Sequence, residues 1–68
     1  MTLGDILNWS GILKKGTTVI IHSGDATLRG NWMDEDDKTI LRFILANKNV
    51  ECPTTEYSSQ LDLLEVWL

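Results

Sequence analysis

Residues 17–32 constrain the fold more than any other stretch, because their pattern nearly fixes its own geometry. They predict a β-hairpin with a two-residue turn at Ser23 and Gly24. An even loop sets Val19 opposite Leu28 and keeps the apolar residues of both strands on one face, whereas a slip of one residue turns every side chain to the other face. The predicted inward residues are Val19, Ile21, Ala26 and Leu28, and the predicted outward residues are Thr27, Arg29 and Asn31.

The length of the chain limits how much core can form. Sixty-eight residues predict a single domain spanning residues 1–68, since chains of this size bury only about 60% of their unfolded surface. Ordering the backbone costs on the order of 1 to 2 kcal/mol per residue. With 43% apolar residues, nearly all large side chains must be buried, or a partner must cover some of them.

Cysteine and histidine are scarce, which limits the available chemistry. Cys52 has no second cysteine for a disulfide, and one thiol with the single histidine, His22, cannot make a structural zinc site. The N-terminus lacks the basic region and long apolar core of a signal peptide, and no apolar run approaches the roughly 20 residues of a membrane span. We expect a cytoplasmic protein with no metal, no cofactor and no membrane partner.

The net charge of the chain indicates which class of macromolecule it can bind. Ten carboxylates against six lysines and arginines give a net charge of −4. Such a balance disfavours contact with the phosphate backbone of a nucleic acid. We therefore expect a protein, rather than DNA or RNA, as the direct partner.

Two helices are predicted on either side of the hairpin. Residues 2–13 carry apolar side chains mostly at three- and four-residue spacing, with Thr2 as the cap. Residues 35–46 form the second helix, with Asp34 as the cap and carboxylates in the first turn, where negative charge is favourable. Residues 39–46 are also rich in strand-forming residues, and the capping run favours the helix.

The last third of the chain predicts two further strands. The first is short, spans residues 50–52 and ends at Pro53, and residues 54–60 follow as a polar turn. Residues 61–68 alternate imperfectly and predict a strand that is apolar on both faces, although a helix beginning at Ser59 also fits. The strand places Leu64, Val66 and Leu68 on one face, and Leu61, Leu63, Glu65 and Trp67 on the other.

Together these elements predict an α+β fold. Their order is helix, strand, strand, helix, strand, strand, with an antiparallel sheet and both helices packed on one of its faces. Gly30 lies within the second hairpin strand, where a missing side chain indicates a bulge or the close approach of another element such as Trp9 or Trp32.

A set of core and turn positions accompanies this order of elements, namely Leu3, Ile6, Leu7, Gly16, Thr17, Val19, Ile21, Leu28 and Gly30. In these positions the chain resembles small uncharacterised phage and prophage proteins. The resemblance covers most of the chain and implies an accessory or inhibitor protein that acts on a host protein. Because it is carried by core and turn positions, no functional residue follows from it.

His22 and Cys52 are the candidates for catalysis. An imidazole at a strand end can act as a base, and a thiol as a nucleophile, if the two meet in a concave pocket. No second histidine and no serine or cysteine at a recognisable spacing accompanies His22. Because cysteine is among the most buried residue types, we interpret Cys52 as a small apolar side chain and predict that the protein is not an enzyme.

Four consecutive acidic residues occupy positions 34–37. A calcium loop spaces its ligands at alternate positions and needs a turn glycine and a distal glutamate, which this run lacks. A favourable first helical turn explains most of the run. The functional alternative is that the run imitates nucleic-acid phosphates and occupies a basic groove of another protein.

Three tryptophans are unusual in so small a chain, and tryptophan is enriched at binding hot spots. We predict that Trp9 and Trp32 lie in or near the core and that Trp67 lies partly on a surface that another chain covers. An apolar C-terminal segment of this kind favours a homodimer.

The sequence therefore predicts a non-enzymatic protein-binding module, and the resemblance to phage proteins implies an accessory or inhibitor role on a host protein. The alternatives are an acidic mimic of nucleic acid and, less favoured, a small enzyme that uses His22 and Cys52. The predicted partner-binding residues are Trp67, Leu63, Glu65, Asp34, Glu35 and Asp36.

Overall fold

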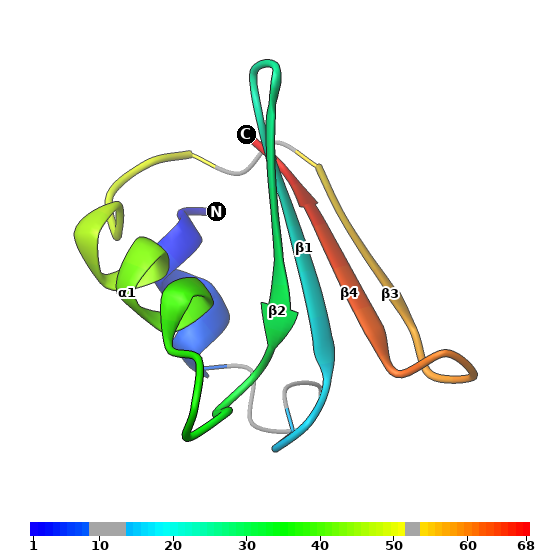
Figure 1. Ribbon diagram of the computed structural model, residues 1–68. Coiled ribbons are helices and arrows are strands. Elements are labelled where there is room, and N and C mark those ends of the chain that lie inside the picture. The colour runs from blue at the N-terminus through cyan, green and yellow to red at the C-terminus, as the bar shows by residue number, and fades with distance from the viewer. Residues whose placement is uncertain (9–13, 52–53) are drawn as a thin grey trace.

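The structure, a computed structural model, describes residues 1–8, 14–51 and 54–68. It has an α+β architecture in which a four-stranded sheet packs against two short helices (Figure 1). The elements in chain order are the 3₁₀ helix η1 (Leu3–Asn8), β1 (Thr18–Ser23), β2 (Ala26–Asn31), α1 (Thr39–Ala46), β3 (Thr54–Ser58) and β4 (Leu63–Trp67).

The sheet is mixed, so the predicted antiparallel sheet is wrong. The strand order is β2, β1, β4, β3, with β1 antiparallel to β2 and parallel to β4, and β3 antiparallel to β4. β4 is the second strand of a hairpin with β3 and enters the sheet beside β1 in the same direction. Local patterns predict hairpins but carry no signal for a pairing between strands so far apart in the chain.

The first hairpin forms with an even loop, as predicted, but its turn lies one residue further along. Gly24 and Asp25 are the turn residues, because Ser23 pairs with Ala26. Gly24 has a φ of 59°, and the first central residue of a two-residue hairpin turn needs a positive φ, which glycine adopts without strain. The register differs from the predicted one by two residues, so each side chain keeps its predicted face.

A buried threonine ties the start of β1 to the start of β4. The Thr17 hydroxyl donates to the Asp62 carboxylate at 2.8 Å and accepts the Lys14 backbone N–H at 3.2 Å, and Thr17 is fully buried. The Thr18 backbone N–H donates to the Asp62 carbonyl at 3.0 Å. Asp62 has a φ of 49°, a conformation that aspartate adopts more readily than most residues. These bonds set the register in which Thr18 lies beside Leu63.

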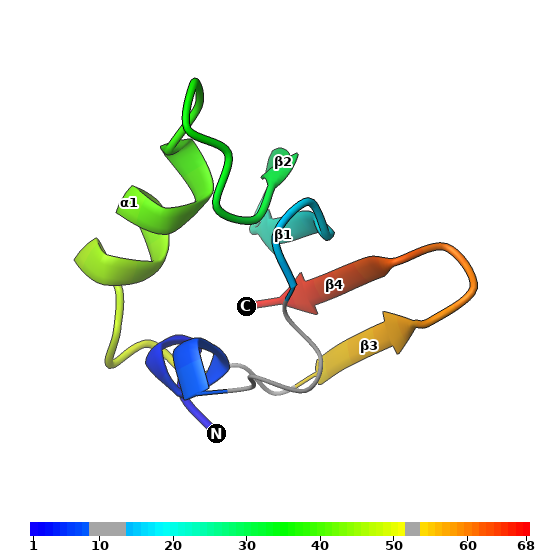
Figure 2. The ribbon, with the colours of Figure 1, turned by 90° about the horizontal axis from the view of Figure 1, so that it is seen from below.

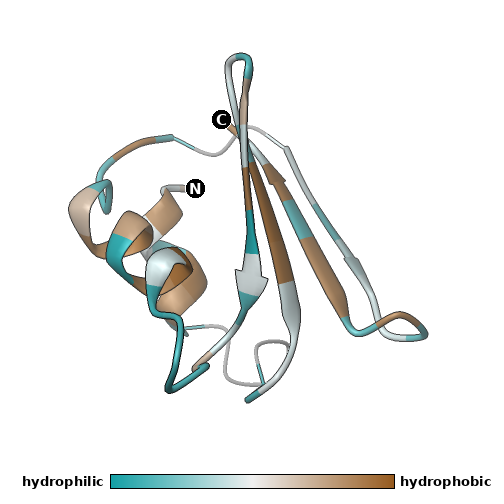
Figure 3. Ribbon diagram, viewed as in Figure 1, coloured by the Kyte–Doolittle hydropathy of each residue, from teal (hydrophilic) through white to brown (hydrophobic). Residues whose placement is uncertain are grey.

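The core lies on one face of the sheet, where η1 and α1 both pack (Figure 2). Figure 3 shows apolar segments on the two central strands and on both helices. A Cβ at Gly30 would lie 2.8 Å from Ile40 Cγ1, so β2 and α1 approach closely at this glycine, as predicted, and the neighbour is Ile40. The buried apolar residues are Leu3, Ile6, Val19, Ile21, Trp32, Ile40, Ile44, Leu64 and Val66.

The first helix begins where it is predicted to begin. η1 starts at Leu3, and the Asp5 carboxylate accepts the Thr2 backbone N–H at 2.8 Å, which satisfies one donor at the start of the helix. Residues 9–13, including Trp9, lie outside the described residues, so the predicted end of this helix is untested. Trp32 is buried with 9% of its surface exposed, as predicted.

The second helix begins four residues later than predicted. The Asp34 carboxylate accepts the Asp36 backbone N–H at 2.9 Å, and the Asp37 carboxylate accepts the backbone N–H and the hydroxyl of Thr39. Such side-chain bonds to the backbone compete with a helical turn, so the acidic run is a loop and Lys38, without a side-chain cap bond, precedes the helix. The Thr39 hydroxyl and then its N–H hold the pKa of Asp37 below the ordinary value.

The C-terminal segment forms a second hairpin. β4 is a strand, as predicted, and not a helix from Ser59. β3 occupies residues predicted to be a polar turn, because Thr55 and Tyr57 alternate toward the core side and favour extended backbone. The predicted strand at residues 50–52 does not form in its described part, where Glu51 makes only an isolated bridge with Thr2. Cys52 and Pro53 lie outside the described residues.

The buried hydroxyl of Thr17 provides a test of the β1–β4 register. Thr17→Val keeps the shape of the side chain but leaves the Asp62 carboxylate without its donor. We expect the free energy of unfolding to fall by about 1 to 3 kcal/mol in urea denaturation. Thr18→Val is the matched control, because the Thr18 hydroxyl makes only an exposed 3.4 Å contact, and we expect a change within about 0.5 kcal/mol. Equal losses in the two variants would contradict this register.

Candidate functional site

The sheet has a second face that no described element covers. Both helices lie on the same side of the sheet, and the other side is open in Figure 2. We call this surface the open face. It carries the alternate residues of each strand, which are Thr27, Arg29 and Asn31 of β2, Thr18, Ile20 and His22 of β1, Leu63, Glu65 and Trp67 of β4, and Thr54, Glu56 and Ser58 of β3.

Strand pairing arranges these residues in rows that cross the sheet. Because the register is known for every pair of neighbouring strands, the members of each row follow directly. One row is Asn31, Thr18, Leu63 and Ser58, the next is Arg29, Ile20, Glu65 and Glu56, and the third is Thr27, His22, Trp67 and Thr54.

His22, Glu65 and Trp67 form the most ordered contact on the open face. His22 Nε2 lies 2.6 Å from Glu65 Oε2, and each of the two side chains is a little under one third exposed. An ionised carboxylate only accepts hydrogen bonds, so we assign the hydrogen to Nε2 of the imidazole. The His22 ring stacks on Trp67 with 5.2 Å between ring centroids and 13° between ring planes. The stack and the hydrogen bond hold three side chains of two strands in one arrangement.

Together with His22 and Glu65, Thr27 gives the sequence hydroxyl, imidazole, carboxylate that is found in the catalytic triads of hydrolases. Its hydroxyl lies 3.5 Å from His22 Nδ1, so hydroxyl, imidazole and the Glu65 carboxylate follow one another. Thr27 is exposed on the open face, and the shallow pocket that Glu65 lines is shared with residues of β3 and the β3–β4 turn and not with Thr27 or His22. The His22 ring thus orients both Glu65 and Trp67. Cys52, the other half of the enzyme alternative, lies outside the described residues.

The structure brings together three of the six predicted partner-binding residues. Leu63, Glu65 and Trp67 occupy alternate positions of β4 and share the open face, and Trp67 is partly exposed, as predicted. Ile20 and His22 are their neighbours on β1, and neither was predicted as a binding residue. The alternation of β1 assigns both to this face, but only the parallel pairing with β4 places them beside the others.

The other three predicted residues, Asp34, Glu35 and Asp36, lie apart from these in the loop between β2 and α1. Asp34 is engaged within the loop by the Asp36 backbone N–H. Glu35 lies 3.7 Å from Lys15 Nζ, in an ion pair whose side chains are 86% and 74% exposed. A pair this exposed contributes little to stability.

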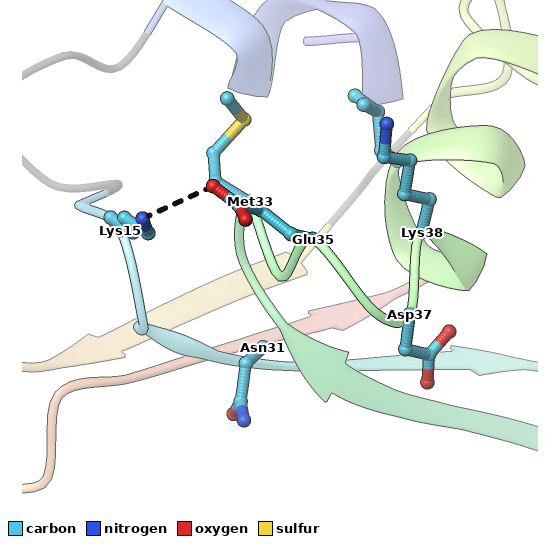
Figure 4. Close-up of a pocket in the computed structure, with 7 residues that line it drawn as sticks. Lys15, Asn31, Met33, Glu35, Asp37 and Lys38 are labelled. Carbon is cyan, nitrogen blue, oxygen red and sulfur yellow. Dashed lines mark ion pairs between the residues drawn. The ribbon is translucent and has the colours of Figure 1, made fainter.

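A small pocket of about 200 Å³ lies beside this loop. Figure 4 shows Lys15 directed toward Glu35, whereas the side chains of Asn31 and Asp37 point away from that pair. In a small-molecule site the polar groups of the lining converge on one point, whereas here they point in different directions. The lining residues are Lys15, Asn31, Met33, Glu35, Asp37, Lys38 and Leu41.

The part of the chain that the structure describes offers no metal site. Within it, no three His, Cys, Asp or Glu side chains gather as they would around a metal ion. No helix of residues 1–8, 14–51 or 54–68 is long and apolar enough to cross a bilayer. No protein-family model, curated protein or solved structure matches this chain. The open face is therefore interpreted from its own geometry.

The His22–Glu65 bond can be measured by a double-mutant cycle. We expect His22→Ala and Glu65→Ala each to lower the free energy of unfolding, and the double variant to lose less than their sum by about 1 kcal/mol, as for a partly buried hydrogen bond. His22→Ala with Glu56→Ala is the control, because Glu56 lies on the far side of Glu65 and should show no coupling. Additive losses for His22 and Glu65 would show that the bond does not form in solution.

Proposed function

We propose that this protein is a non-enzymatic protein-binding module and that the open face is its contact surface. The observation that carries the proposal is the position of Ile20, Leu63 and Trp67, three large apolar side chains that are only partly buried and lie together on the two central strands. Partly exposed apolar side chains grouped on one surface of a small domain are typical of interaction sites.

The composition of the surface supports the same function. Tryptophan contributes strongly to binding because it buries a large area with little conformational entropy to lose. Trp67 is held against His22 before any partner arrives, which lowers the entropy lost on binding. Charged residues flank this centre, with Arg29 on β2 and Glu56 on β3. An apolar centre with a polar rim is the usual layout of a protein interface.

The proposal extends to the class of partner. The resemblance to phage proteins favours a host protein of the cytoplasm, and the apolar surface of β4 favours a second copy of the chain. A direct nucleic-acid partner is disfavoured by the net charge of −4. The acidic-mimic alternative draws less support, because Asp34 and Asp37 accept hydrogen bonds within their own loop.

Site-specific photo-crosslinking tests this function and captures the partner whatever its identity. The photoreactive residue p-benzoylphenylalanine is placed at Leu63 on the open face, and at Lys48 as a control on the helix side, in cells that make the protein. We expect irradiation to join the Leu63 variant, and not the Lys48 variant, to another polypeptide chain. Equal labelling of the two positions, with folding verified by circular dichroism, would remove the open face as a binding surface.

A further inference from the structure

We infer that the chain bound to the open face is a second copy of this protein, packed sheet against sheet about a two-fold axis that runs along the strands. This inference rests on the proposed function and adds the identity and orientation of the partner. It follows from the positions of the charged residues in the central row of the open face.

The central row of the open face has a positive charge at one edge of the sheet and a negative charge at the other. Arg29 lies on β2 at one edge of the sheet, and Glu56 lies on β3 at the other edge. Ile20 of β1 and Glu65 of β4 stand between them. Adjacent strands are about 4.8 Å apart, so Arg29 and Glu56 are separated by about 14 Å and do not pair within one chain. Among the described residues neither Arg29 nor Glu56 belongs to an ion pair, so both charges can meet charges of another molecule.

A symmetric pair of sheets packed face to face has its two-fold axis in the plane between them. If the axis runs across the strands, each strand lies over its own copy, and Arg29 meets Arg29 while Glu56 meets Glu56. If the axis runs along the strands, β2 of one chain lies over β3 of the other, and Arg29 meets Glu56 twice. Like charges placed opposite each other across an interface are unfavourable, so of these two aligned arrangements the second is selected.

The same axis determines which side chains of the two copies face each other at the centre of the interface. β1 of one chain lies over β4 of the other, so His22 lies over Trp67 and Thr18 over Leu63 of the second copy. Ile20 lies over Glu65, whose carboxylate already accepts the His22 hydrogen bond of its own chain and is thereby partly compensated. The apolar side chains of both copies then leave water together, which is the main source of stability in such an interface.

The size of the face sets the expected strength. Four strands of about five residues cover roughly 19 by 17 Å, from the usual strand spacing and rise. This is about 320 Å² per chain and about 650 Å² for the pair, less than the roughly 1,000 Å² of most stable interfaces, so the dimer is expected to be weak and transient. We therefore expect the dimer to form mainly at protein concentrations of about 100 µM and above.

Sedimentation velocity with charge-reversal variants tests the inference. We expect the wild-type chain to dimerise between about 100 µM and about 1 mM. Arg29→Glu and Glu56→Arg should each weaken the dimer by about tenfold or more, because each places like charges opposite each other. The double variant Arg29→Glu/Glu56→Arg should return to about the wild-type affinity, since it restores both pairs with reversed sign. Lys48→Glu changes the charge equally on the helix side and should have no effect.

Three outcomes would overturn the inference. They are a wild type that stays monomeric over the whole range, single variants that dimerise as the wild type does, and a double variant that does not recover. Failure of the proposed function is a separate result, because it is the absence of specific photo-crosslinks at Leu63. Crosslinks from Leu63 to a different protein, with a monomeric wild type, would keep the binding function and exclude the second copy.

Discussion

The parallel pairing of β1 with β4 is the contact on which the rest of the structure depends. Each hairpin is local, and an isolated two-stranded hairpin is marginally stable at best in water. Joined along β1 and β4, the two hairpins form one sheet whose central strands supply Val19, Ile21, Leu64 and Val66 to the core. The hydrogen bond from Thr17 to Asp62 lies where this pairing begins and fixes its register. A shift of one residue would turn the apolar residues of β4 away from the helices.

The same register produces the open face. It places Ile20 and His22 of β1 beside Glu65 and Trp67 of β4, although about 45 positions separate them in the chain. Glu65 also lies opposite Glu56 of β3, and like charges opposite each other weaken a strand pair. The hydrogen bond to His22 holds the Glu65 carboxylate toward β1, on the side away from Glu56. One contact thus orders the centre of the surface and relieves repulsion beside it.

Local patterns were enough to predict the first hairpin, the inward position of Val19 and Ile21, and β4 with its two faces. They failed at residues 35–38, because the carboxylates of Asp34 and Asp37 accept backbone hydrogen bonds within the loop and α1 begins only after it. They also failed for β3 and for the direction of β4 in the sheet, which depend on partners distant in sequence. For the same reason half of the predicted binding residues came together on the open face, Ile20 was not predicted to belong to it, and His22 was considered only as a catalytic candidate.

The long separation between Thr17 and Asp62 also affects how the chain folds. Contacts between distant residues form only after the entropy of closing the intervening loop has been lost, so they slow folding more than local turns do. We expect both hairpins to form early and their docking along β1 and β4 to limit the rate. Substitution of Thr17 should then slow folding with little effect on unfolding, which chevron kinetics measure. The docking of the two hairpins is therefore the step that we expect to set the folding rate.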